Sequence, residues 1–160
     1  MFTRIPLQFV GAWRRLGIEA GDSPLTEDSH VIWLQSGSRY TDIRVPAPNA
    51  RADSDKLVTT NAGVEAFAGG FHWQAPTLTF EHELDFTANY PDDQGDLSWE
   101  ADTLVETGRA EVNGKTIAYR EYWQRLSRKS PVSETWEIRG SSKLIAIALR
   151  IDDHACVISN

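Results

Sequence analysis

Apolar and polar side chains alternate strictly between residues 78 and 87. The even positions hold leucine, phenylalanine and histidine, and the odd positions hold threonine and acidic residues. A period of two places these two sets on opposite faces of a β-strand. Shorter stretches of the same kind recur along the chain, and Asn113-Gly114 between two of them is a strong hairpin signal because both residues tolerate positive φ. The pattern predicts a mainly β protein.

About nine or ten strands can be counted, and many of them are joined by short turns. Sequential antiparallel hairpins in a chain of 160 residues favour an up-and-down β-barrel or a sandwich, and we expect the barrel. No repeat or linker divides the chain, so residues 1–160 are expected to form a single domain. Residues 55–68 do not alternate and precede Gly69-Gly70, which predicts a short helical insertion there.

Composition excludes several classes of function. The formal net charge of −7 disfavours nucleic acid and anionic membranes as partners, since both require clustered lysine and arginine. The only cysteine, Cys156, cannot form an intramolecular disulfide, which suits a reducing compartment, and we expect the cytoplasm. We read no signal peptide, and no apolar stretch reaches the roughly 20 residues of a membrane span. We expect no cofactor, no metal site, and a monomer or homodimer.

Charged residues interrupt several strand faces that also carry aromatic residues. Tyr40, Asp42 and Arg44 share one face, and Glu106 interrupts an apolar face of a later strand. Buried charges have to be paired or hydrogen-bonded, so this pattern indicates a polar pocket inside the barrel. In it, Arg44 would hold the anionic or carbonyl-bearing head of a small apolar or aromatic ligand. The candidate ligand-binding residues are Trp33, Gln35, Tyr40, Asp42, Arg44, Glu106, Tyr119, Glu121 and Trp123.

Three other interpretations stay open. Arg44 or Arg125 could simply pair with the carboxylates across strands, or the alternating residues could face solvent. The chain could be an enzyme with Asp42 or Glu121 as the base and Arg44 as the oxyanion partner. No nucleophile elbow, phosphate-binding loop or dinucleotide-binding glycine motif supports a particular reaction, so no catalytic residue is assigned. The chain could also be a filled barrel that serves as a protein-interaction module.

Gly11-Ala12-Trp13 resembles the Gly-x-Trp motif that opens the first strand of lipocalins and other calycins. In those families the tryptophan closes one end of the barrel and packs against an arginine of a late strand. The resemblance therefore implies Arg150, or alternatively Arg139, as the partner of Trp13. Secreted lipocalins carry signal peptides and cysteine pairs, which this chain lacks, so the resemblance does not imply transport of a secreted odorant or retinoid.

A longer series of motifs resembles an uncharacterised family of lipocalin-like proteins, of unknown function, some with two barrel domains. This resemblance implies a calycin barrel with the helical insertion near its mouth, and it implies no reaction. The motifs are Trp13-Arg14, Trp33-Leu34-Gln35, Tyr40 to Pro46, Glu106-Thr107-Gly108 and Tyr119 to Trp123.

Overall fold

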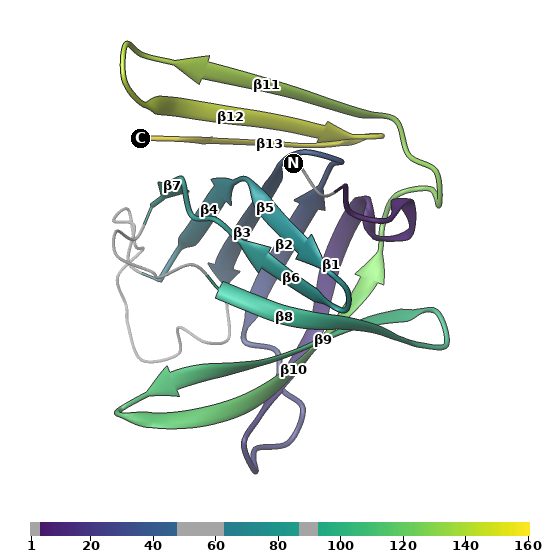
Figure 1. Cartoon of the computed structure of the whole chain (residues 1–160). Helices are drawn as coiled ribbons and strands as arrows, with labels where there is room; N and C mark the ends of the chain where they lie inside the picture. Colours follow the sequence, from purple (N-terminus) through teal and green to yellow (C-terminus); the bar gives the residue numbers. More distant parts are fainter. Residues whose placement is uncertain (1–3, 48–62, 87–92) are drawn as a thin grey trace.

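The computed structural model describes residues 4–47, 63–86 and 93–160 and arranges them in two antiparallel β-sheets (Figure 1). A short 3₁₀ turn, Leu7–Phe9, precedes the first strand. The mainly β prediction is confirmed. Among the described residues, no helix is long and apolar enough to cross a membrane.

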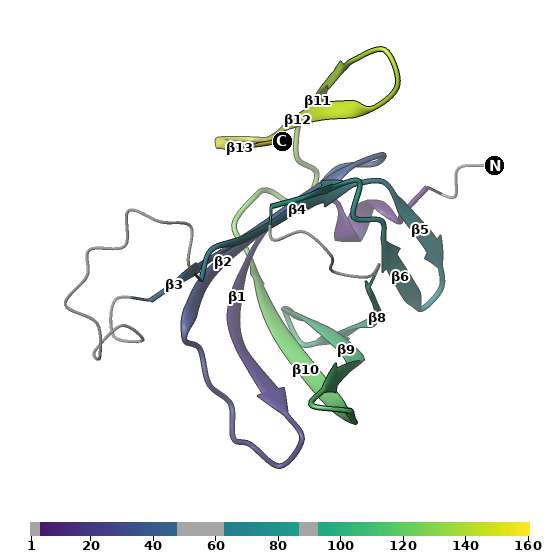
Figure 2. The same ribbon diagram turned by 90° about the vertical axis from the view of Figure 1, so that its left-hand side faces the viewer.

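The larger sheet has ten strands and curls strongly (Figure 2). Its strand order is β5-β6-β8-β9-β10-β1-β2-β3-β4-β7. The strands are β1 (Gly11–Ala20), β2 (Ser29–Gln35), β3 (Tyr40–Pro46), β4 (Glu65–Gly69), β5 (Phe71–Gln74), β6 (Thr77–Phe80), β7 (Leu84–Asp85), β8 (Asp93–Glu100), β9 (Thr103–Val112) and β10 (Lys115–Arg125).

One bent hairpin connects the two ends of this sheet. Only Gly70 separates β4 from β5, and residues 81–83 separate β6 from β7. The hairpin contributes to both ends of the sheet. Its β4 and β7 pair with each other and continue from β3, whereas its β5 and β6 pair with each other and continue to β8. The sheet therefore curls into a half-barrel that is joined across β5 and β6 and parts where β7 diverges from β8.

The smaller sheet has three strands, β11 (Ser133–Arg139), β12 (Leu144–Ile151) and β13 (His154–Ser159). It covers the outer face of β2, β3, β4 and β7 (Figures 1 and 2). Ile147 and Leu149 of β12 are buried in this interface against Leu34, Ala68 and Leu84. Strands β2 to β4 are consequently buried on both faces. Their inner face packs in the cluster inside the half-barrel, and their outer face packs against the smaller sheet.

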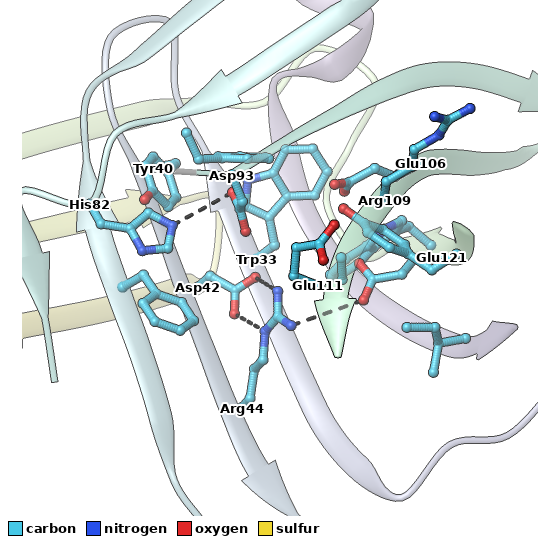
Figure 3. A pocket seen from close by; sticks show the side chains of 16 residues that line it. Trp33, Tyr40, Asp42, Arg44, His82, Asp93, Glu106, Arg109, Glu111 and Glu121 are labelled. Carbon is cyan, nitrogen blue, oxygen red and sulfur yellow. Dashed lines mark hydrogen bonds and ion pairs between the residues drawn. The ribbon is translucent and has the colours of Figure 1, made fainter. Parts of the chain in front are cut away.

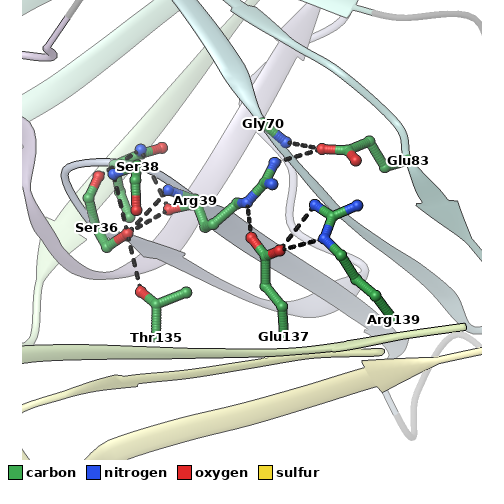
Figure 4. Close-up of polar contacts among 9 residues, drawn as sticks. Ser36, Ser38, Arg39, Gly70, Glu83, Thr135, Glu137 and Arg139 are labelled. Atoms are coloured by element: carbon green, nitrogen blue, oxygen red, sulfur yellow. Dashed lines mark hydrogen bonds and ion pairs between the residues drawn. The ribbon is translucent and has the colours of Figure 1, made fainter. Parts of the chain in front are cut away.

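A cluster of polar contacts fastens the smaller sheet at the β2–β3 turn (Figure 4). Ser36 caps this turn, since its Oγ accepts the backbone N–H groups of Ser38 and Arg39. The Arg39 guanidinium donates to Glu137 of β11 and to Glu83, which also accepts the N–H of Gly70 at 2.9 Å. Arg39 therefore links the smaller sheet to the bend between β4 and β5.

The strand predicted over residues 78–87 is interrupted at residues 81–83. Leu78 and Phe80 belong to the cluster inside the half-barrel, whereas Leu84 packs under the smaller sheet. The apolar side chains therefore switch faces at the interruption. A strictly periodic sequence hides this switch because the inner face of β6 and the outer face of β7 are both buried.

The helical insertion predicted over residues 55–68 is wrong where it can be checked. Residues 55–62 lie outside the described part of the chain, and Glu65–Gly69 is strand β4. Phe67 points to the interior cluster, while Ala66 and Ala68 lie under the smaller sheet. The alanines look helix-favouring in sequence, but their small size lets the second sheet approach. The last three strands, which the sequence did not separate from the barrel, form that second layer.

Trp13 belongs to the cluster of buried residues inside the half-barrel. Its side chain is fully buried, and its Nε1 donates to the carbonyl oxygen of Phe9 at 3.1 Å. The Arg125 guanidinium of β10 lies over the indole, 4.2 Å from the ring centroid, and donates to the carbonyl oxygen of Val10. The predicted partners were wrong: Arg150 and Arg139 belong to the smaller sheet, where they pair with Glu134 and Glu137.

Candidate functional site

The inner face of the half-barrel encloses a pocket of about 470 Å³ (Figure 3). Eight of the nine predicted ligand-binding residues line it. The ninth, Gln35, is fully buried beside it, where its Oε1 accepts the Trp33 indole N–H at 3.2 Å and its Nε2 donates to the Ser36 carbonyl oxygen. Gln35 thus holds Trp33 and does not form the wall. The eight are Trp33, Tyr40, Asp42, Arg44, Glu106, Tyr119, Glu121 and Trp123.

Strand register brings the predicted residues together. Trp33 of β2 lies directly opposite Asp42 of β3, and Glu106 of β9 lies directly opposite Glu121 of β10. Alternation then places Tyr40, Arg44, Tyr119 and Trp123 on the same inner face. The aromatic part of the wall is continuous, since the Trp33 ring meets Phe80 and Trp123 in edge contacts.

Arg44 is committed to the protein's own carboxylates. Its Nε donates to Asp42 Oδ1 at 2.9 Å, its Nη2 donates to Asp42 Oδ2 at 3.3 Å, and its Nη1 lies 4.0 Å from Glu121 Oε1 (Figure 3). Burial opposes its charge, but Asp42 and Glu121 raise the pKa of Arg44 well above its usual value. The guanidinium that the sequence suggested for an anionic head is therefore already matched.

Arg15 is a site residue that the sequence analysis missed. It is buried, and it donates to Glu121 at 2.6 Å and to Glu27 at 2.9 Å. Burial raises the pKa of the Glu121 carboxyl, while Arg44 and Arg15 oppose that effect. One signal was available: Arg15 follows Trp13 by two positions, so an inward Trp13 places Arg15 on the inner face as well.

Other wall residues also went unpredicted. Phe67, Phe80 and His82 come from the bent hairpin, and His82 Nε2 lies 3.6 Å from Asp93 Oδ1. The histidine was visible in sequence as the polar exception on an apolar strand face. The exposed part of the wall, which we call the mouth, consists of Arg109, Ala110 and Glu111.

Two glycines keep the centre of the pocket open. A Cβ at Gly95 would lie 2.4 Å from Glu106 Cγ, and a Cβ at Gly108 would lie 2.3 Å from the Tyr119 hydroxyl oxygen. Each of these larger side chains therefore lies flat over a glycine of the neighbouring strand. Any other residue at either position would push Glu106 or Tyr119 into the pocket.

Glu106 and Tyr119 present polar groups to the pocket that have no partner among the residues that the structure describes. Among the described residues, neither the Glu106 carboxyl nor the Tyr119 hydroxyl makes a hydrogen bond or an ion pair, and the buried Trp123 Nε1 has no hydrogen-bond partner. Burial, with the charges of Glu121 and Asp93, raises the pKa of Glu106 well above its usual value, which favours its neutral form. Burial and Glu106 likewise raise the pKa of Tyr119.

The same contacts bear on the enzyme interpretation. Asp42 is occupied by Arg44, and Glu121 is occupied by Arg15, so both suggested bases sit in ion pairs. Either carboxylate would have to leave its guanidinium partner before it could abstract a proton from a ligand.

Comparison with known proteins places the chain in a family. A family model described as Protein HRI1 matches residues 12–159. No curated protein and no solved structure matches the chain. The match covers both sheets and every residue of the pocket wall. None of these comparisons links the chain to the calycins, whose Gly-x-Trp motif Gly11-Ala12-Trp13 resembles.

Proposed function

This chain belongs to the HRI1 family of proteins, and from its interior pocket we propose that it binds a small molecule with an apolar or aromatic body and a polar head. One observation carries the proposal: about 470 Å³ of space is lined by aromatic rings together with polar groups, such as Trp123 Nε1 and Asp93 Oδ1, that have no hydrogen-bond partner in the described part of the chain. Pockets of roughly 300–1,000 Å³ with a mostly apolar wall and a few polar groups are typical of small-molecule sites.

The unfilled centre supports this proposal against a packed interaction module. Protein interiors normally close-pack, and polar groups inside them find partners. Here Gly95 and Gly108 hold the interior open, and Glu106 and Tyr119 remain without partners in the described part of the chain. Open space and polar groups without partners both lower stability. A ligand that fills the space and accepts hydrogen bonds from these groups explains best why the site keeps them.

We also propose the cytoplasm as the compartment. Support comes from Cys156, which as the only cysteine cannot staple the fold. Imaging of the chain with a fluorescent tag is the direct test, and accumulation in a secretory compartment would contradict this location.

Binding is tested with a neutral aromatic probe, 2-acetylnaphthalene. Trp33 and Trp123 line the pocket, so an occupant should change tryptophan fluorescence, and binding to the native state alone should raise Tm. Ala110→Trp places an indole across the mouth and should weaken binding by about tenfold or more, because the entrance is narrowed.

The matched control is Thr107→Trp, which adds the same indole to an exposed position of β9 outside the pocket wall. It should leave the affinity of the probe unchanged. Equal loss of binding in both variants, or no change of fluorescence and Tm with any aromatic probe, would contradict the proposed function.

A further inference from the structure

We propose that the polar head of the ligand is a neutral hydrogen-bond acceptor, a carbonyl oxygen, that Glu106 and Tyr119 hold together. The inference rests on the proposed function and specifies the class of ligand: a flat apolar body that carries a ketone, aldehyde or quinone oxygen. It replaces the anionic head that Arg44 suggested in the sequence.

The balance of charge disfavours an anionic head. The pocket wall carries five carboxyl groups (Asp42, Asp93, Glu106, Glu111 and Glu121) and two guanidinium groups (Arg44 and Arg109). Arg44 is matched by Asp42 at 2.9 Å, and Arg109 lies at the exposed mouth. An anion that reached the interior would therefore meet carboxylates and no uncommitted cation of the described wall, and like charges at close range repel.

The deep carboxylates disfavour a cationic head as well. Asp42 and Glu121 are matched by Arg44 and Arg15, so a cation would compete with buried guanidinium groups. It could otherwise pair with an ionised Glu106 or with Asp93, whose Oδ1 is buried and lies 3.6 Å from His82 Nε2. Either pairing would remove the charge of the ligand from water, which is costly.

Geometry favours one oxygen shared by Glu106 and Tyr119. Gly95 and Gly108 are directly paired across β8 and β9. Glu106 Oε1 lies 2.5 Å from the Cβ position of Gly95, and the Tyr119 hydroxyl lies 2.3 Å from that of Gly108. Because the two glycines face each other, the Glu106 carboxyl and the Tyr119 hydroxyl lie over neighbouring positions of the same inner face.

Neighbouring positions on one face suit two donors that converge on one acceptor. Each O–H···O bond spans about 2.7–2.8 Å, and a carbonyl oxygen offers two lone pairs. Both groups keep their protons, because burial raises the pKa of the Glu106 carboxyl and of the Tyr119 hydroxyl. A protonated carboxyl and a phenol are therefore both donors, and the aromatic wall formed by Trp33, Phe80 and Trp123 takes the flat body.

Four naphthalenes with one body and different heads test the inference by fluorescence titration. They are 2-acetylnaphthalene (ketone), 2-ethylnaphthalene (no acceptor), 2-naphthoate (anion) and 2-naphthylmethylammonium (cation). The ketone should bind about tenfold more tightly than the other three, since two hydrogen bonds are gained without burying a charge. Tyr119→Phe and Glu106→Leu should each remove most of the preference for the ketone over 2-ethylnaphthalene.

Thr107→Val is the matched control, because it deletes a hydroxyl from the exposed outer face of β9. Equal affinity for the ketone and the hydrocarbon, or tightest binding of the anion or the cation, overturns the inference and leaves the proposed function standing. Failure of all four probes to bind overturns the proposed function, and the inference with it. If Glu106→Leu does not fold, Tyr119→Phe decides the outcome alone.

Discussion

At the scale of single residues, the protonation of Glu106 connects the pocket to stability. In the unfolded chain this carboxyl titrates near its ordinary value of 4.5, whereas in the folded protein burial and the neighbouring carboxylates raise its pKa. The folded state then binds more protons than the unfolded state between the two values. The contribution of Glu106 to stability is therefore full below about pH 4.5 and is lost as pH rises through the folded pKa.

Replacing this carboxyl by an amide should remove the loss of stability that Glu106 causes at high pH. Glu106→Gln cannot ionise, so it should have a higher Tm than the parent at pH 8, and the gain should shrink towards pH 4.5. Thermal unfolding across this range measures the effect, with Glu65→Gln, at a half-exposed position, as the control. A gain that stays constant with pH would show that Glu106 does not titrate differently in the folded protein.

At the scale of elements, the β2–β3 turn joins the two sheets through Arg39. Its guanidinium is mostly buried and contacts Glu137 of β11 and Glu83 beside β7. The partners lie far apart in sequence, and none of these three residues lines the pocket. Attachment of the second sheet and binding in the pocket should therefore be separable.

Arg39→Met should loosen the attachment and leave the pocket intact. We expect a loss of about 1 kcal/mol in the free energy of unfolding, a value between those of exposed and buried charged hydrogen bonds. Hydrogen exchange should become faster in β11 while the affinity for 2-acetylnaphthalene stays the same. Arg139→Met is the control, since Arg139 is exposed and contacts Glu137 from the same strand. Unchanged exchange in β11 would remove Arg39 from this role.

At the scale of the whole molecule, the two sheets share one buried interface, which supports the prediction that they fold as a single domain. Ile147 is fully buried between them, against Ala68 and Leu84. The outer face of β2 to β4 would expose these apolar side chains to water if the smaller sheet detached. Neither layer is therefore expected to persist alone.

Ile147→Ala should lower the free energy of unfolding by about 2–5 kcal/mol, through lost burial and the cavity that remains. Unfolding should stay a single transition, with far-ultraviolet circular dichroism and tryptophan fluorescence coinciding. Val157→Ala is the control, because Val157 is 69% exposed on the same sheet and should change stability by about 0.5 kcal/mol or less. Two separate transitions would contradict the single-domain prediction.

Much of the candidate site could be predicted from local sequence. Alternation alone placed Tyr40, Asp42 and Arg44 on one face and Tyr119 and Trp123 on another, and all five line the pocket. That success follows from the pleat, which sends successive side chains to opposite faces in any strand. Whether these residues bind a ligand remains a prediction.

The sequence by itself determined that the chain is mainly β and which side chains share a strand face, because both depend only on neighbouring residues. Tertiary structure alone decided that the last three strands form a second layer, that Arg44 pairs with Asp42, and that Arg125 packs on Trp13. Those outcomes depend on strand register and on which faces meet, and such contacts join residues distant in the chain. Where both faces of a strand are buried, as in β3, alternation of polarity no longer marks the inside.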